Sequence, residues 1–373
     1  MKVLIAIDSM KGSLGSIEGG EAVAEGVLRV FPDAECEVRP LADGGEGTVD
    51  ALVSGLGGEF REVAVTGPLS RPVEARYGLV GKTAVLEMAA AAGITLVGEA
   101  EKNPALTTTF GVGEMIADAV GQGARKFIVG IGGSATNDGG AGMLQALGFR
   151  LLDAEGRDLP RGDAALSRLA AIDSSRALPE LRDCVFKIAC DVVNPLCGGN
   201  GASAVFGPQK GATPEMVRDL DAALANFAAV SGGDAMFPGV GAAGGLGYAF
   251  RTFLHGELKS GVELVLDETG FEERARSADF VVTGEGRLDE QTVMGKAPIG
   301  VARAAKKFGK KVIAFCGCVT DGAKKVNEHG IDAFFPILRS VLTLEEALER
   351  RTAAKNLTDT TEQVFRCLRL SVP

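Results

Sequence analysis

The sequence has few of the residues that build metal-bound or disulfide-bonded scaffolds. Only two of the 373 residues are histidines, His255 and His329, and neither lies near a pair of cysteines. The seven cysteines are an odd number and contain no C-x-x-C pair. Because a structural zinc site needs clustered cysteines and histidines, we expect reduced thiols and no such site.

Long apolar runs are also absent. The N-terminal run at residues 3–7 ends at Asp8, which is too short for the core of a signal peptide. No stretch approaches the ~20 apolar residues of a membrane helix. The formal net charge of −10 opposes a general affinity for nucleic acid or for an anionic membrane. These features favour a cytoplasmic protein that acts on small molecules, without nucleic acid or membrane as a partner.

Glycine is the residue in excess. It accounts for 52 of the 373 residues, which is about twice its usual share. The glycines follow no period and gather between apolar runs, which is typical of tight loops where backbone approaches a ligand. Charged residues make up an ordinary 24% and apolar residues 46%, so the chain has the composition of a folded protein with a large core.

The two ends of the chain have the rhythm of a parallel α/β domain. Apolar patterns predict strands at 1–8, 36–38, 279–283, 311–316 and 333–337, and helices at 16–31, 48–56, 298–307, 322–329 and 344–365. Two βα units at the start and three at the end add up to one five-stranded parallel sheet with helices on both faces.

The middle of the chain follows another pattern. Residues 59–100 alternate between apolar and polar positions and contain a Gly-Pro turn, which indicates antiparallel strands. We therefore predict an α/β protein in which a flavodoxin-like or Rossmann-like domain, residues 1–58 plus 268–373, is interrupted by a mixed α/β domain, residues 59–267. The active site is expected in the cleft between them. Two or three consecutive domains are the competing layout.

Two polar segments follow the first two predicted strands. In the first, residues 8–13, Lys11 could face an anion, while Ser9 and Ser13 could cap the next helix. In the second, residues 42–48, three glycines could turn backbone N–H groups toward a ligand while Asp43 or Glu46 reaches a hydroxyl group or a metal. The alternative for both is ordinary turn and capping chemistry. The chain contains no Walker A spacing.

A third segment imitates a dinucleotide-binding fingerprint. Residues 130–135 fit G-x-G-x-x-A after a predicted strand, and Asp153 follows 23 residues after Gly130. However, Gly139 and Gly140 fall where the helix of the fingerprint should run, at a cost of roughly 2 kcal/mol. We therefore predict a longer loop whose polar side chains face a substrate. A second match at 239–244 has no strand before it and is weak.

Two further segments carry charged side chains at strand ends. Asp191 and Asn194 follow the apolar run 185–189, and Lys210 lies between glycines soon afterwards. Residues 283–296 hold three carboxylates, an arginine and a lysine, which suits a metal-bound polyphosphate. Turn chemistry and a surface ion-pair cluster are the respective alternatives.

Taken together, these segments resemble the bacterial class I glycerate kinase family, in order and over nearly the whole chain. Met10, where an aromatic residue is expected, and Met294 are small departures. The matching motifs are D-S-M-K-G-S (8–13), A-D-G-G-E-G-T-V-D-A-L (42–52), N-P-A-L-T-T-T-F-G-V-G-E (103–114), G-I-G-G-S-A-T-N-D-G-G-A-G-M-L-Q-A-L-G (130–148), C-D-V-V-N-P-L-C-G (190–198), G-A-S-A-V-F-G-P-Q-K-G-A (201–212), G-A-A-G-G-L-G (241–247) and T-G-E-G-R-L-D-E-Q-T (283–292).

The resemblance implies ATP-dependent phosphorylation of D-glycerate in the breakdown of glyoxylate or sugar acids, with 2-phosphoglycerate favoured over 3-phosphoglycerate. It also implies two α/β domains, the first flavodoxin-like. Phosphoryl transfer needs Mg²⁺ ligands, cations near the γ-phosphate and a carboxylate near the attacking hydroxyl group. ATP and Mg²⁺ are therefore the expected co-substrate and cofactor, and a homodimer is compatible with the sequence.

Candidates exist for each of these roles. Asp191 is the proposed base and Lys11 the proposed phosphate cation. The candidates for binding glycerate are Ser134, Asn137, Asp138, Lys210 and Arg287. Those for binding the nucleotide are Asp8, Ser9, Gly44, Gly45, Gly132, Gly133, Gly284 and Glu285. Those for Mg²⁺ are Asp8, Glu285 and Asp289.

Two other functions fit the same loops. An NAD(P)-dependent dehydrogenase would use residues 130–153 as its fingerprint. A non-catalytic regulator that binds a small molecule would keep the glycine-rich loops but release no ADP.

Overall fold

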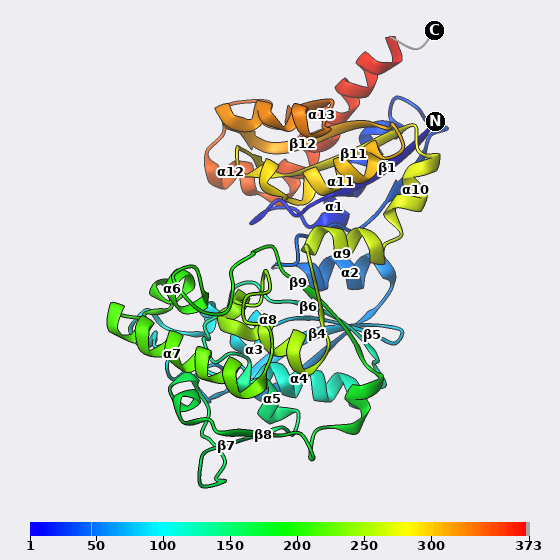
Figure 1. Cartoon of the computed structure of the whole chain (residues 1–373). Coiled ribbons are helices and arrows are strands. Elements are labelled where there is room, and N and C mark those ends of the chain that lie inside the picture. Colours follow the sequence, from blue (N-terminus) through cyan, green and yellow to red (C-terminus); the bar gives the residue numbers. More distant parts are fainter. Residues whose placement is uncertain (46, 371–373) are drawn as a thin grey trace. The chain divides into compact units, whose positions relative to one another are not determined.

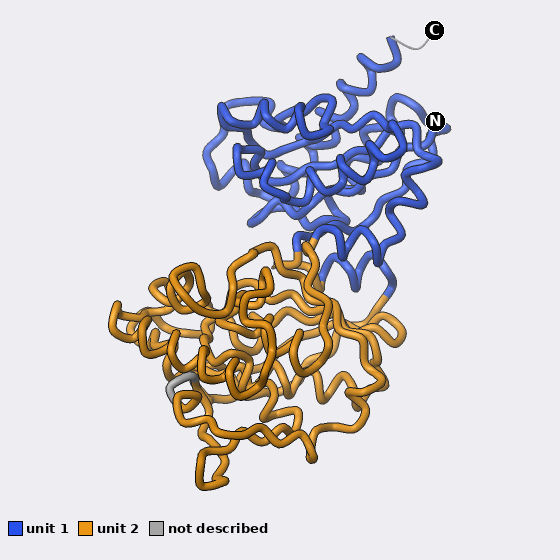
Figure 2. The backbone as a smooth tube through the Cα atoms, viewed as in Figure 1, with its two compact units in different colours: residues 1–43, 50–57, 262–373 blue, residues 44–49, 58–261 orange. Residues whose placement is uncertain are grey.

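The structure is a computed structural model that describes residues 1–45 and 47–370. The chain forms two compact units, which Figure 2 distinguishes by colour. Unit 1 comprises residues 1–43, 50–57 and 262–373, and unit 2 comprises residues 44–49 and 58–261. Both units contain a β-sheet with helices packed on it (Figure 1).

Unit 1 is built on a five-stranded, fully parallel sheet. The strand order is β13-β12-β11-β1-β2, which is the flavodoxin-like order 2-1-3-4-5 when the strands of this unit are counted along the chain. The predicted α/β class and five-stranded parallel sheet are confirmed. The strands are β1 (Lys2–Ile7), β2 (Glu35–Val38), β11 (Phe280–Leu288), β12 (Lys311–Val319) and β13 (Ala333–Pro336).

Helices cover both faces of this sheet (Figure 1). The helices on its faces are α1 (Ser16–Leu28), α9 (Gly261–Glu268), α10 (Phe271–Ser277), α11 (Ala297–Lys306) and α13 (Arg350–Leu370). The unit also contains α2 (Thr48–Leu56) and α12 (Leu344–Leu348). In β1, Leu4 and Ala6 pack with α9, α10 and α11, whereas Val3 and Ile5 pack with α1 and α13. This alternation is the period of two of a strand that is buried on both sides.

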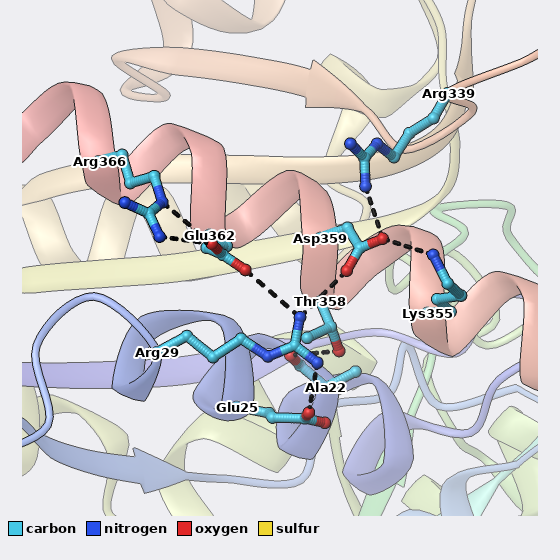
Figure 3. Close-up of polar contacts among 9 residues, drawn as sticks. All are labelled: Ala22, Glu25, Arg29, Arg339, Lys355, Thr358, Asp359, Glu362 and Arg366. Atoms are coloured by element: carbon cyan, nitrogen blue, oxygen red, sulfur yellow. Dashed lines mark hydrogen bonds and ion pairs between the residues drawn. The ribbon is translucent and has the colours of Figure 1, made fainter.

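The first and last helices of unit 1 lie against each other (Figure 3). A Cβ atom at Gly26 would lie 2.5 Å from the carbonyl oxygen of Thr358, so glycine permits this approach. The Thr358 hydroxyl donates to the carbonyl of Ala22 at 3.0 Å, and Arg29 lies 3.0 Å from Asp359. These contacts fix α13 on α1.

The structure differs from three predicted element boundaries. Residues 321–329 form a 3₁₀ helix, in which the buried residues Ala323 and Val326 are one turn apart. The predicted helix 344–365 is two helices, since Glu349 leaves helical geometry and accepts hydrogen bonds from the N–H groups of Arg351 and Thr352. The third difference is that β11 and β12 continue together beyond their predicted ends, to Leu288 and Val319, which are paired.

Unit 2 contains a six-stranded mixed sheet in the order β10-β9-β6-β5-β4-β3. Its strands are β3 (Glu59–Thr66), β4 (Pro72–Val80), β5 (Thr83–Glu87), β6 (Lys126–Gly130), β9 (Val185–Ala189) and β10 (Glu257–Lys259). Strands β3, β4 and β5 pair antiparallel, as predicted for residues 59–100, and β5, β6, β9 and β10 are parallel. A separate hairpin-like pair joins β7 (Arg150–Leu152) to β8 (Ala171–Asp173).

The helices of unit 2 pack with the sheet into one apolar core. They are α3 (Ala89–Ala92), α4 (Phe110–Gly121), α5 (Ala141–Ala146), α6 (Ala202–Phe206), α7 (Pro214–Ser231) and α8 (Ala242–Phe253). The four parallel strands end in one row, because Glu87, Gly130, Ala189 and Lys259 are successive partners. The loops that follow these strands therefore start from one edge of the sheet.

The contact between α1 and α13 gives a test of the packing in unit 1. We expect Gly26→Ala to lower the free energy of unfolding by about 1–3 kcal/mol, because the new methyl group overlaps α13. Gly19→Ala, in the same helix, should be neutral or stabilising, since its methyl group would lie 3.4 Å from Ile7 and alanine favours a helix by up to about 1 kcal/mol. Urea denaturation of both variants measures the difference, and equal stability would contradict the close packing.

Candidate functional site

A pocket of about 570 Å³ opens in unit 1 at the carboxyl ends of β1, β11 and β12. The strand order reverses between β1 and β11, and open parallel sheets bind their ligands at such a point. We call it the unit 1 pocket. Its charged and hydroxyl-bearing lining residues are Asp8, Ser9, Lys11, Ser13, Asp43, Glu285, Arg287 and Lys296.

Asp8 follows β1 and is the most strongly perturbed acid of this pocket. Its Oδ1 accepts a hydrogen bond of 2.7 Å from the backbone N–H of Ser9. Burial, together with the charges of Asp43 and Glu285, raises the pKa of Asp8 to about 7, and the Ser9 hydrogen bond and Lys11 offset this shift only in part. The negative charge of Asp8 is therefore incompletely compensated by the protein itself.

The pKa values of Glu285 and Asp289 are shifted in opposite directions, although both residues belong to the segment 283–296. Burial raises the pKa of Glu285, against a 2.7 Å hydrogen bond from the hydroxyl of Thr292 and the attraction of Lys296. Asp289 is held below its usual pKa, because Lys296 and two backbone N–H groups outweigh its burial. Asp289 does not line the pocket. It fixes the turn after β11 and positions Lys296.

The loop after β1 does not cap α1. The predicted capping role of Ser9 and Ser13 is wrong, because α1 starts after Gly15, and no side chain caps it. The Oγ atom of Ser13 is buried without a hydrogen-bond partner among residues 1–45 and 47–370, and it lines the pocket. Lys11 is exposed at the pocket and lowers the pKa of Asp8 by its charge. These two groups are available to an anionic ligand.

The acids of the unit 1 pocket fit one mode of Mg²⁺ binding. Among the described residues, no three His, Cys, Asp or Glu side chains are placed to hold a metal ion by themselves. Mg²⁺ in nucleotide sites is usually held by one or two carboxylates together with phosphate oxygens. Asp8 and Glu285 suit that arrangement, because the charge of Glu285 raises the pKa of Asp8 and a cation would relieve this repulsion.

In unit 2, Gly44 and Val49 contact residues at the ends of the parallel strands. A Cβ atom at Gly44, where φ is +84°, would lie 2.5 Å from that of Ala189. A Cβ atom at Gly130 would lie 2.4 Å from the carbonyl oxygen of Gly44, and the N–H of Val49 donates to Glu87 at 3.0 Å. Gly44, which was predicted to face a ligand, is thus required by packing at this edge, whereas a Cβ atom at Gly47 would meet nothing within 4 Å. Glu46 lies outside the described residues.

The loop that follows β6 is longer than a Rossmann turn, as predicted. Residues 131–140 are non-helical and α5 begins at Ala141. Asp153, the expected ribose ligand of a dinucleotide site, accepts hydrogen bonds from the backbone N–H groups of Glu155 and Arg157 at 3.0 and 2.9 Å. Asp153 therefore stabilises its own turn, which disfavours the dehydrogenase interpretation.

Asp138 and Asn137 lie in the interior of unit 2. The carboxylate of Asp138 accepts hydrogen bonds from the N–H and hydroxyl of Thr109 at 2.8 and 2.9 Å, and from the N–H groups of Gly140 and Gly142. Burial raises its pKa while these hydrogen bonds lower it. Asn137 is fully buried and donates to Ser203. Both side chains hold the loop in place, and the structure does not open them to a substrate.

The 241–247 motif packs against the loop that follows β6. Gly244 has a φ of +66°, and a Cβ atom there would lie 2.1 Å from the carbonyl oxygen of Thr136. The N–H of Gly139 donates to the carbonyl of Gly244 at 2.9 Å, and a Cβ at Gly241 would lie 2.1 Å from the carbonyl of Pro195. Three separate glycine-containing motifs therefore pack together at one edge of the sheet.

Lys210 is a buried cation behind the exposed part of the loop. Its Nζ atom donates to the hydroxyl oxygen of Ser134 at 2.7 Å and to the carbonyl of Thr136 at 2.5 Å. Burial lowers the pKa of Lys210 to about 7, and Asp138 partly offsets this shift. Since Ser134 accepts from Lys210, its own proton can be donated to another group. Gly132 and Gly133 beside it are exposed, so this segment presents hydrogen-bond donors.

Asp191 follows β9 at the same edge of unit 2. It is exposed, and its Oδ1 accepts a 3.0 Å hydrogen bond from the backbone N–H of Gly261. A Cβ atom at Gly44 would lie 3.0 Å from the Cα of Gly261, so Asp191, Gly44 and Gly261 are neighbours. The carboxylate is therefore oriented by backbone next to the glycine-rich segments.

The other predicted residues lie in unit 1. Gly284 is buried in β11, where a Cβ would lie 2.1 Å from the carbonyl of Phe315, so packing explains this glycine. Arg287 is exposed, lines the unit 1 pocket, and approaches Asp289 at 3.4 Å. Ser13 and Lys296 also line the pocket. Sequence analysis assigned Ser13 to a helix cap, and it included the lysine at 296 in the segment 283–296 without giving it a role of its own.

Comparison with known proteins identifies the family of this chain. The glycerate kinase family model matches residues 3–369. A Bacillus subtilis protein named glycerate kinase is 48% identical over 378 residues, covering 100% of this chain and 98% of its own. An Escherichia coli protein named glycerate 2-kinase is 49% identical over 354 residues, with 93% of both chains covered. The chain belongs to the glycerate kinase family.

A solved structure agrees with this assignment. A crystal structure from Salmonella typhimurium LT2, provisionally named glycerate kinase 2, matches with a TM-score of 0.92 and 47% identity, covering 100% of this chain and 99% of its own. The predicted family and the predicted class of enzyme, a kinase among the transferases, are confirmed. No helix in the described part of the chain is long and apolar enough to cross a membrane.

The pKa of Asp8 predicts a pH-dependent stability. Because the folded protein holds this proton up to about pH 7, it binds more protons than the unfolded chain between about pH 4 and 7, and stability falls as the pH rises through this window. We expect Asp8→Asn to remove that fall and to be more stable than the native sequence at pH 8, by at most about 4 kcal/mol.

Chemical denaturation at pH 4.5, 6 and 8 measures this effect. Asp33→Asn, at an exposed aspartate of unit 1, is the matched control and should follow the native pH profile. If Asp8→Asn and Asp33→Asn showed the same pH dependence, the electrostatic account of Asp8 would be wrong.

Proposed function

We propose that the chain transfers the γ-phosphoryl group of ATP to the 2-hydroxyl group of D-glycerate, giving 2-phosphoglycerate and ADP. The reaction would serve the breakdown of glyoxylate or sugar acids in the cytoplasm. The observation that carries the proposal is the unit 1 pocket, where under-compensated carboxylates and available cations line the ligand-binding edge of a flavodoxin-like sheet. The name of the Escherichia coli relative supports the 2-hydroxyl as acceptor.

The phosphate groups of the nucleotide are proposed to bind in the unit 1 pocket. Lys11, Lys296 and Arg287 supply positive charge there, and the buried Ser13 hydroxyl supplies a donor. Asp8 and Glu285 would hold Mg²⁺ together with phosphate oxygens, and the ion would neutralise charge on the transferred group. Binding of the cation should lower the pKa of Asp8, since an adjacent positive charge favours the carboxylate.

Glycerate is proposed to bind at the carboxyl edge of the unit 2 sheet. Its carboxylate needs donors, which the exposed backbone of Gly132 and Gly133 and the Ser134 hydroxyl can supply. Lys210 keeps the Ser134 oxygen occupied and contributes a positive field from behind the loop. Asn137 and Asp138 act through the loop that they hold in place.

Asp191 is the proposed base or orienting group for the glycerate hydroxyl. It is an exposed carboxylate whose position is set by the N–H of Gly261, so it can accept a proton without a large rearrangement. General-base help of this kind contributes about 10²–10⁴ to a rate. Positioning and charge neutralisation supply the remainder, because phosphoryl transfer involves little covalent chemistry by the protein.

The direct test is an ADP-release assay with purified enzyme, MgATP and D-glycerate, followed by identification of the product isomer by phosphorus NMR. We expect ADP and 2-phosphoglycerate in equal amounts. Absence of turnover would reject the proposed function, and formation of the 3-phosphate isomer would reject its regiochemistry. A reaction with a nicotinamide cofactor would instead support the dehydrogenase.

Asp191→Asn tests the proposed base. We expect kcat to fall about a hundredfold or more, with little change in the KM for ATP, because the amide cannot take the proton from the hydroxyl group. Asp219→Asn, at an exposed aspartate of α7, should keep native kinetics. Steady-state kinetics of both variants measure this, and near-native turnover of Asp191→Asn would remove Asp191 from the role.

A further inference from the structure

The unit 1 pocket has two chemically different ends. The sheet edge contributes the charged groups described above, whereas a second part of the lining comes from the segment after β13 and from α12 and α13. This second wall is almost entirely aliphatic, and one amide interrupts it. We call it the aliphatic wall; its residues are Ile337, Leu338, Leu344, Leu348, Ala353 and Asn356.

The aliphatic wall exposes apolar surface that the fold leaves uncovered. Leu344 is 75% exposed, Leu338 43% and Leu348 37%, although each lines the pocket. Scattered surface leucines need no explanation, but several on one wall of a concave site that also holds convergent polar groups indicate a ligand with an apolar part.

The local sequence holds this wall in a defined geometry. Thr343 and Glu346 form a capping box at the start of α12, so the helix begins at a fixed residue. Leu344 and Leu348 are four residues apart and therefore share a face of α12. Glu349 ends α12 and accepts hydrogen bonds from the first N–H groups of α13, which fixes the angle at which the chain enters α13.

Asn356 is the single amide of the aliphatic wall. It lies on α13, which the contacts of Figure 3 hold on α1. Within residues 1–45 and 47–370, its side-chain amide makes no hydrogen bond, although the residue is partly buried at the pocket. An amide offers one acceptor and two donors, which suits the polar edge of a heterocyclic base.

We propose that the aliphatic wall binds the base of the nucleotide, with the base stacked on Leu344 and Leu348 and its polar edge at Asn356. The proposal rests on the proposed function, in which a nucleoside triphosphate is the phosphoryl donor. A pocket of about 570 Å³ has room for both the base and the phosphates. The charged end then holds the phosphates, and the aliphatic wall distinguishes a nucleotide from an inorganic phosphate chain.

The test compares MgADP with magnesium pyrophosphate as ligands of the full-length enzyme, using titration calorimetry. Both ligands engage the charged end, but only ADP carries a base. We expect Leu344→Ser and Leu348→Ser each to weaken ADP binding by about fivefold, and the double variant by about twentyfold. Each substitution removes a leucine side chain that the bound base would partly bury. Pyrophosphate affinity should stay within about twofold of native in every variant.

Val341→Ser is the matched control. Val341 belongs to the same segment and is fully exposed, and it does not line the pocket. It should bind both ligands with native affinity. Asn356→Leu, which keeps the size of the side chain and removes its polar atoms, should weaken ADP about threefold and leave pyrophosphate unchanged.

The outcomes separate this proposal from the proposed function. If the leucine variants bound ADP as tightly as Val341→Ser, or lost ADP and pyrophosphate affinity equally, the aliphatic wall would not be the base site. A native enzyme that turns over ATP but binds ADP no better than pyrophosphate would also overturn it. An enzyme that does not use ATP at all would instead reject the proposed function.

Discussion

The structure depends on close approaches of backbone to backbone that a Cβ atom would prevent. At Gly44 and Gly244 the chain has positive φ and lies within 3 Å, measured from an ideal Cβ, of a neighbouring segment. These contacts join segments distant in sequence at the carboxyl edge of the unit 2 sheet. The excess of glycine in the composition is therefore explained mainly by packing. The loops are held in place because they pack closely against one another, and the groups that face a ligand lie on these packed loops.

The second constraint is electrostatic. Asp8, Asp43 and Glu285 are kept near one another even though the arrangement raises the pKa of Asp8 to about 7. Burial of Lys210 lowers its pKa to about 7, close to the value that Asp8 reaches from below. Both groups would be easier to accommodate in their neutral states, so the fold spends stability to keep ionisable groups at places where a charged ligand restores the balance. Binding of a cation near Asp8, or of an anion near Lys210, would therefore stabilise the charged form of that residue.

Much of the fold was predictable because it rests on local periodicity. The strands of unit 1 alternate or run apolar in the manner of a doubly covered sheet, and β1, α1 and β2 form close to where their patterns predict. The failures have physical reasons. The break at Glu349 depends on a side chain that caps the next helix, and the extension of β11 to Leu288 depends on pairing with β12. Ser13 was assigned to a cap because serine is common there, whereas Gly15 occupies the N-cap position of α1 and Ser13 lines the pocket.

The site was predictable only as far as residue type and strand end determine position. Asp8, Lys11 and Asp191 follow strands, and Glu285 lies in the last part of β11. The topology of a parallel sheet brings such residues to one edge within each unit. Asn137 and Asp138 have the same polar character but are buried. Thr109 approaches Asp138 and Ser203 approaches Asn137 from segments distant in sequence, and no local pattern reveals these approaches. The aliphatic wall could not be predicted from the sequence, because its apolar residues are exposed where their pattern predicts burial. Leu344 and Leu348 have the spacing of an ordinary buried helix face. Their exposure follows from the shortness of α12 and from the turn at Glu349. As a result, this face of α12 lines a pocket that also holds charged residues.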